Sequence, residues 1–111
     1  MSATALSDVF GALADRHRLA IVEKLRTGGE VPVGELASDL PLTAPAVTHH
    51  IRVLEKAGLV ERRAHRQQRL IRLRPAALEA VDDWLGAYRT YWSGALDRLE
   101  RELQSRKKET P

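Results

Sequence analysis

The chain has 111 residues, of which 43% are hydrophobic and 30% charged, and it contains no cysteine. This composition is that of a globular protein, so we expect one domain over residues 1–105 and a polar tail at 106–111. The lack of cysteine excludes disulfides, thiolate metal sites and thiol redox chemistry. The chain shows neither a signal-peptide pattern nor a long apolar run, so a cytoplasmic location is expected.

Positive charge is concentrated in the middle of the chain. Residues 43–74 carry eight Lys and Arg against two Asp and Glu, whereas residues 1–42 and 75–111 are slightly acidic. A basic segment within an otherwise neutral chain is typical of a protein that binds the phosphate backbone of nucleic acid. A solvated basic surface without a partner is the alternative.

Three helices are expected in the first part of the chain. Apolar residues at helical spacing predict one helix at 4–14 and another at 15–27. The second helix has Asp15 as its N-cap and ends at Gly28-Gly29. A short third helix is expected at 33–40, where prolines precede and follow the apolar pattern.

A fourth helix is expected over residues 43–57. Thr43 is a suitable N-cap, and Pro45 is tolerated because the first turn of a helix has no internal hydrogen-bond acceptors for its N–H groups. Gly58 is suited to a left-handed cap at the other end. One side of this helix is apolar and should pack on the preceding helices; it consists of Val47, Ile51 and Leu54.

The pattern then changes to that of a hairpin. Residues 59–64 and 69–73 are short runs rich in Leu, Val and Ile, and a polar stretch at 65–68 separates them. No Gly or Asn marks the turn, so its type stays open. Pro75 then opens the last helix, expected over 75–105.

The last helix carries a heptad-like apolar stripe, formed by Leu78, Val81, Leu85, Tyr88, Trp92, Ala95 and Leu99. A helix of about 30 residues spans roughly 45 Å, which is more than so small a core can cover. Part of the stripe is therefore expected to pack against a second copy of the chain. There are two alternatives: the stripe packs within one chain, or its aromatic residues line a ligand pocket.

The expected fold is mainly α with a small β-hairpin, in the order α-α-α-α-β-β-α. The stretches LADRHRLAIVEKL, VGELASDLPLTAPAVTHHIRVLEKAGLVERR and RLIRLRP resemble the ArsR/SmtB family of winged helix-turn-helix transcriptional regulators. The C-terminal WLGAYRTYWSGALDRLE is similar to the terminal dimerisation helix of part of that family. The resemblance implies a homodimeric, sequence-specific DNA-binding protein, most often a repressor, with activation as the alternative.

The expected DNA contacts lie on the fourth helix and on the hairpin, which is the wing. An α-helix fits the major groove, and its first half usually meets the base edges. The opposite side from the apolar stripe presents Thr43, Ala44, Pro45, Thr48, His49 and Arg52. On the wing, we expect contacts with the DNA backbone or the minor groove from Arg63, Arg66, Gln67, Gln68 and Arg69. Some wing arginines are alternatively expected to pair with Asp82 or Asp83.

The dimer interface is expected on the first and last helices, at Leu6, Phe10, Trp84, Leu85, Tyr88, Trp92 and Leu96. Two-fold symmetry of the protein then implies an inverted-repeat operator, with half-sites about one helical turn apart. A small-molecule or protein effector is left open by the sequence.

Neither a metal cofactor nor catalysis is expected. The thiolate site of the family requires cysteine on the third helix, and the site on the terminal helix requires histidine, which is absent from 75–105. The neighbouring carboxylates of Asp82 and Asp83 diverge on a helix, and the chain has no glycine-rich phosphate loop and no G-x-S-x-G turn. A protein-interaction module that has lost specific DNA binding is the alternative function.

Overall fold

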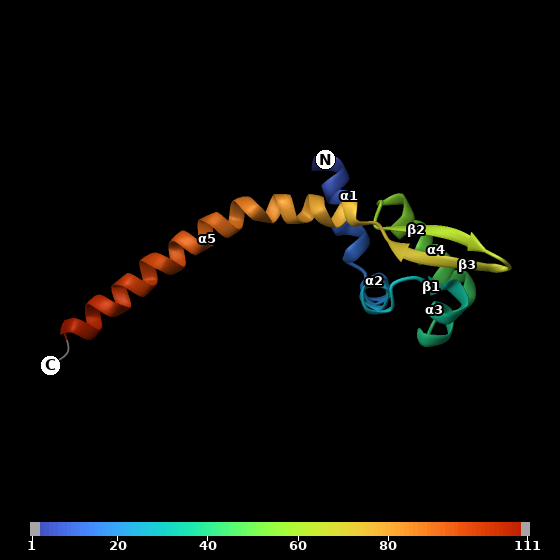
Figure 1. Cartoon of the computed structure of the whole chain (residues 1–111), viewed down its shortest axis with the longest axis horizontal. Coiled ribbons are helices and arrows are strands. Elements are labelled where there is room, and N and C mark those ends of the chain that lie inside the picture. Colours follow the sequence, from blue (N-terminus) through green and yellow to red (C-terminus); the bar gives the residue numbers. More distant parts are fainter. Residues whose placement is uncertain (1–2, 110–111) are drawn as a thin grey trace. The chain divides into compact units, whose positions relative to one another are not determined.

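The computed structural model describes residues 3–109 of the chain. Its elements in chain order are α1 (Ala3–Leu13), α2 (Arg16–Gly28), β1 (Val31–Pro32), α3 (Val33–Asp39), α4 (Ala44–Lys56), β2 (Val60–His65), β3 (Gln68–Leu73) and α5 (Pro75–Glu109) (Figure 1). The predicted fold, mainly helical with a small antiparallel hairpin and a long last helix, is confirmed. α5 continues past residue 105, where the sequence pattern predicted its end.

The chain forms two compact units, Met1–Ala80 and Val81–Pro111. The core of the first unit is built from fully buried aliphatic side chains of every element around it, including Val9, Ile21, Leu36, Ile51, Leu54, Leu59 and Ile71. The apolar stripe predicted for α4 is confirmed, because its three residues are all buried. The polar side of α4 is thereby left at the surface.

The sheet has three strands, in the order β1-β3-β2, and not the two predicted. β1 pairs with β3 through the register Val31↔Ile71 and Pro32↔Leu70. Proline, which has no N–H to donate, is tolerated in this strand because the strand lies at the edge of the sheet. The pairing fixes the middle of β3 to the segment that leads into α3.

Side-chain and glycine caps define the helix ends. The Asp15 carboxylate accepts hydrogen bonds from the N–H groups of His17 and Arg18, at 2.8 and 3.1 Å, so its predicted role as N-cap of α2 is confirmed. Gly58 has a φ of 78°, as expected for a left-handed cap. The Gly58 N–H donates to the Glu55 carbonyl, and the next N–H donates to the Leu54 carbonyl, which is the Schellman pattern.

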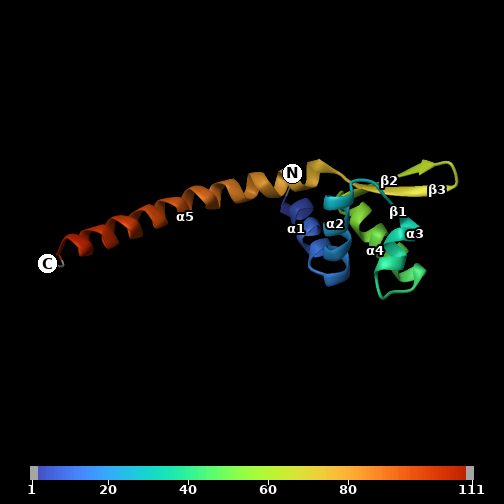
Figure 2. The same cartoon turned by 60° about the horizontal axis from the view of Figure 1, so that its bottom comes forward.

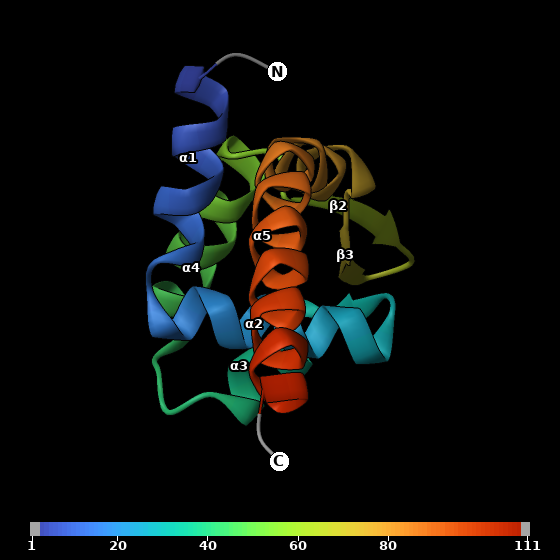
Figure 3. The same cartoon turned by 90° about the vertical axis from the view of Figure 1, so that its left-hand side faces the viewer.

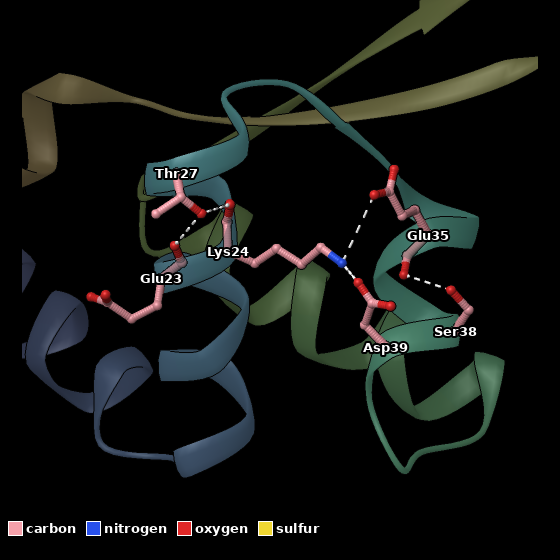
Figure 4. A network of polar contacts seen from close by, with 6 residues as sticks. All are labelled: Glu23, Lys24, Thr27, Glu35, Ser38 and Asp39. Atoms are coloured by element: carbon pink, nitrogen blue, oxygen red, sulfur yellow. Dashed lines mark hydrogen bonds and ion pairs between the residues drawn. The ribbon is translucent and has the colours of Figure 1, made fainter.

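An ion-pair network joins α2 to α3 (Figure 4). The Lys24 ammonium contacts the carboxylates of Asp39 and Glu35, the latter at 4.0 Å. Ser38 Oγ donates to the Glu35 carbonyl at 3.0 Å. Lys24 is half-buried, so the network holds α3, the first helix of the helix-turn-helix, against the rest of the unit.

Candidate nucleic-acid interface

The N-terminus of α4 carries the residues predicted to approach DNA bases. Thr43 is the N-cap of α4, and its Oγ1 accepts a hydrogen bond from the Ala46 N–H at 3.3 Å. Ala44 and Pro45 in the first turn are exposed. Small side chains at this end leave the helix backbone accessible, and the N–H groups of a helix N-terminus favour phosphate.

Further along α4, His49 and Arg52 are exposed and Thr48 is half-buried. Together with the residues of the first turn, they form one continuous polar side opposite the buried apolar stripe. Lys56 continues this side into the last turn. The structure thus places every predicted contact of the fourth helix on the same accessible surface.

The loop end of the wing extends beyond α3 and α4 in two views (Figure 1 and Figure 2). Arg66 and Gln67 form a two-residue turn between the strands, and Gln68 and Arg69 follow at the start of β3, all four exposed. Arg66 has a φ of 58°, the left-handed region in which glycine and asparagine are preferred. A turn with arginine at this position gives no signal in the sequence, which is why its type stayed open.

The two faces of the wing carry different arginines. Arg62 lies opposite Ile71 in the β2–β3 register, and Ala64 lies opposite Arg69. Directly opposed residues of an antiparallel pair point to the same side of the sheet, and residues two apart share that side. Arg62 and Arg69 therefore lie on the same face as the buried Ile71, the inner face of the wing, whereas Arg63 and Arg72 lie on the opposite, outer face.

Ion pairs occupy the arginines of this other face. The Nε atom of Arg63 is 2.7 Å from Glu30 Oε1, a pair that lowers the pKa of the Glu30 carboxyl and raises the pKa of Arg63. Glu61 accepts from Arg72 Nε at 2.5 Å and lies 3.8 Å from Arg74 Nε. The acidic partners of Arg63, Arg72 and Arg74 are thus glutamates of the first unit.

A cleft of about 320 Å³ lies where the wing meets α4. Thr48, Arg52 and Ile51 of α4 line it together with Val33, Arg62 and Arg69. Arg62 was not among the predicted contacts. It is half-buried and forms an ion pair with Glu55 of α4. The alternation of side chains between the two faces of β2 could have assigned Arg62 to the inner face. No signal in the sequence indicates that it pairs with Glu55.

Arg18 links α4 to the first two helices. Its Nε donates to the Ala12 carbonyl at 2.7 Å, and its Nη1 lies 3.3 Å from Nδ1 of His50. α1, α2 and α4 pack against one another in this part of the fold (Figure 3). Burial lowers the pKa of His50, which favours the neutral imidazole, and in the tautomer protonated at Nε2 its Nδ1 accepts the hydrogen bond from the guanidinium.

Known proteins share both the sequence pattern and the fold. A family model described as a helix-turn-helix domain matches residues 13–63. The chain is 42% identical over 94 residues to the HTH-type transcriptional regulator Rv2034 of Mycobacterium tuberculosis (strain ATCC 25618 / H37Rv), a match that covers 85% of this chain and 84% of that protein. It is 27% identical over 82 residues to the transcriptional repressor SdpR of Bacillus subtilis (strain 168), covering 72% and 88% of the two chains. A crystal structure of an ArsR family transcriptional regulator matches with a TM-score of 0.74 at 28% identity, covering 84% of this chain and 95% of that one.

The chain belongs to the ArsR family of winged helix-turn-helix transcriptional regulators. Members of the ArsR family regulate transcription by binding DNA and are not enzymes, which agrees with the sequence-based expectation on both points. Among the described residues, no helix combines the length and the apolar character that a membrane crossing requires. In the same part of the chain, no group of three His, Asp or Glu side chains is arranged to hold a metal ion.

The residues predicted for a dimer interface of this ArsR-family chain lie on α1 and α5. Leu6 and Leu85 are half-buried, and Phe10 is 38% exposed. On α5, large apolar side chains follow the helical spacing and are exposed by 41–60%: Trp84, Tyr88, Trp92, Leu96 and Leu99. The rings of Trp84 and Tyr88 contact each other, with centroids 4.8 Å apart. This exposed apolar stripe extends over four turns of one helix.

Proposed function

We propose that this ArsR-family regulator is a homodimeric repressor that binds an inverted-repeat operator through α4 and the wing and needs no metal ion to do so. The observation that carries the proposal is the continuous polar side of α4, which ends at a cleft lined by Arg52, Arg62 and Arg69. An α-helix with such a side, beside a basic hairpin, has the form of a major-groove reader with a backbone contact next to it.

The assignment of individual contacts follows from the positions of the side chains. Thr48, His49 and Arg52 carry donors and acceptors suited to base edges, and the methyl group of Ala44 suits a thymine methyl. Thr43 and Pro45 lie at the helix N-terminus, where backbone phosphate is favoured. At the wing, the exposed tip residues Arg66, Gln67, Gln68 and Arg69 are proposed as backbone and minor-groove contacts.

Arg63 is the weakest of the predicted contacts. It lies on the wing face turned away from Ile71, and its Nε is engaged by the Glu30 carboxylate. A guanidinium that already has an anionic partner must exchange that partner to bind phosphate. We therefore propose that Arg63 mainly fixes the wing to the segment before β1 and contributes little to DNA affinity.

A second copy of the chain is the proposed partner of the exposed stripe on α5, together with Leu6 and Phe10. Apolar surface of this extent on a single helix is typical of an interface between proteins. The spacing of the exposed side chains by three and four residues is that of a helix pair. Two-fold pairing would present two α4 helices to one face of the DNA.

Two facts support repression without a metal ion. SdpR, 27% identical to this chain, is a transcriptional repressor. The chain has no cysteine, and residues 75–105 have no histidine, so the thiolate ligands of one metal site to which its family resemblance points, and the histidine ligands of the other, are missing. Covering promoter DNA requires only binding, so repression is the simplest consequence of an operator complex.

The dimer is tested by light scattering on Trp92→Glu, which introduces a charge into the stripe. Thr90→Glu is the matched control, because position 90 lies on the opposite side of α5 and changes the net charge equally. We expect Trp92→Glu to be a monomer with little operator affinity and Thr90→Glu to be a dimer. A dimeric Trp92→Glu protein would place the interface elsewhere.

A further inference from the structure

The cleft between α4 and the wing brings three arginines from three different elements to one place. Arg52 comes from α4, Arg62 from β2 and Arg69 from β3. Like charges repel, and such a cluster is stable only where the charges are solvated, paired or bound to an anion. The cleft has room for an anion of the size of phosphate, at about 320 Å³.

The three guanidinium groups differ in how they are engaged. Arg62 donates from Nε to Glu55 Oε1 at 3.0 Å and from Nη2 to the same oxygen, so the remaining N–H groups of this guanidinium are available. Within the described chain, Arg52 and Arg69 form no ion pair. The cleft therefore has a positive excess, in contrast to the outer wing face, where Arg63 and Arg72 are paired with glutamates.

The position of the cleft indicates which anion it meets. When α4 lies in the major groove and the wing approaches the adjacent minor groove, one sugar-phosphate strand runs between them, because each strand separates the two grooves. The cleft is the space between these same two elements. A guanidinium matches the geometry of a phosphate, and the Thr48 hydroxyl, which also lines the cleft, is a further donor.

We propose that the cleft binds one phosphate of the DNA strand that separates the two grooves, with Arg69 and Arg62 as its charged partners and with the Thr48 hydroxyl donating to this phosphate instead of to a base edge. Glu55 positions Arg62 for this contact, and Arg52, at the α4 edge, remains the base contact. The proposal rests on the proposed mode of DNA binding and adds that, of the strand arginines of the wing, those on the inner face hold the backbone and those on the outer face do not.

The test compares two substitutions on the same strand. Arg69→Gln removes a charge from the inner face, and Arg72→Gln removes an identical charge from the outer face, where Arg72 is paired with Glu61. Both side chains are exposed, so both variants should fold, which circular dichroism checks. Affinity for a scrambled duplex is measured by fluorescence anisotropy across a series of salt concentrations, which counts phosphate contacts.

We expect Arg69→Gln to bind about tenfold more weakly and to lower the slope of log K against log salt by about 0.9, the value for one phosphate. Arg72→Gln should leave both quantities at the wild-type values. Equal losses from the two substitutions would overturn the proposal, since the wing would then act only through its total charge. Failure of the wild-type protein to bind any duplex would instead contradict the proposed function itself.

A second measurement locates the contact and separates it from the binding of free phosphate. Single methylphosphonate substitutions remove the charge of one phosphate at a time from a bound duplex. One position should weaken wild-type binding about tenfold and leave Arg69→Gln unaffected, because the contact is already lost in that variant. If every position weakened both proteins equally, while inorganic phosphate raised the Tm of the wild type but not of Arg69→Gln, the cleft would be a site for a free anion and the proposal would be wrong.

Discussion

Replacement of Arg52 by alanine is the most direct test of how α4 reads DNA. Arg52 is exposed, and among the ion pairs of the described residues none involves its guanidinium. Its removal leaves no buried carboxylate unpaired and creates no cavity, so the free energy of unfolding should change by no more than about 0.5 kcal/mol. Because the fold of the variant is then intact, a loss of DNA binding free energy larger than about 0.5 kcal/mol reports a lost contact between Arg52 and the DNA.

The magnitude of that loss depends on what the guanidinium contacts. A bidentate contact with guanine contributes about 1–3 kcal/mol of discrimination, which corresponds to a loss of roughly 5- to 150-fold in affinity for the operator. Binding to a scrambled duplex should fall much less, because only one positive charge is lost. The ratio of operator to scrambled affinity should therefore fall.

Fluorescence anisotropy with the operator duplex and a scrambled duplex measures this ratio. The operator itself is obtained by selecting bound sequences from a random pool with the wild-type protein. Arg52→Lys is the matched control, since lysine keeps the charge but lacks the planar fork. It should retain the affinity for scrambled DNA and lose most of the preference for the operator. An equal loss from Arg52→Ala on both duplexes would refute the assignment and make Arg52 a phosphate contact.

Three further predictions concern stability. Thr43→Ala should cost about 1 kcal/mol through loss of the α4 cap, measured as a lower Tm that Thr43→Ser restores; an unchanged Tm would show that the cap contributes nothing. Burial lowers the pKa of His50 below the value of about 6.5 in the unfolded chain, so the unfolded chain binds this proton at a higher pH than the folded chain, and the free energy of unfolding falls as the pH drops from about 7 through that value. Urea unfolding of His50→Gln should show a flatter profile over that window, and an identical slope would contradict the reasoning. Arg66→Gly should raise the free energy of unfolding by about 1 kcal/mol by relieving the positive φ, while weakening DNA binding; lower stability would mean that the turn carries no strain.

The helices, and the caps of α2 and α4, were predictable because their signals are local. Asp15 and Thr43 cap the N–H groups of residues only two or three positions ahead, and Gly58 closes a helix through bonds to the preceding turn. The apolar side of α4 follows from helical spacing alone. The polar side that carries the proposed DNA contacts is then determined by exclusion.

The features that were missed depend on contacts between distant segments. β1 is only two residues long, too short for any periodic pattern, and it exists because Val31 pairs with Ile71 across 40 positions. The Glu30–Arg63 pair spans 33 positions, so the sequence pattern placed Arg63 among the DNA contacts without showing its acidic partner. Arg62 differs in that its partner Glu55 is seven positions away, but a helix end and a turn separate them.

The most direct test of metal-independent operator binding uses the metal-free wild-type protein and its own operator. Fluorescence anisotropy compares the affinity for this operator with the affinity for a scrambled duplex across a series of salt concentrations. We predict tight binding to the operator alone, with no added metal, and a salt dependence that reports several phosphate contacts. Equal and weak binding to both duplexes, or operator binding that appears only when a transition metal is added, would contradict the proposed metal-independent repressor.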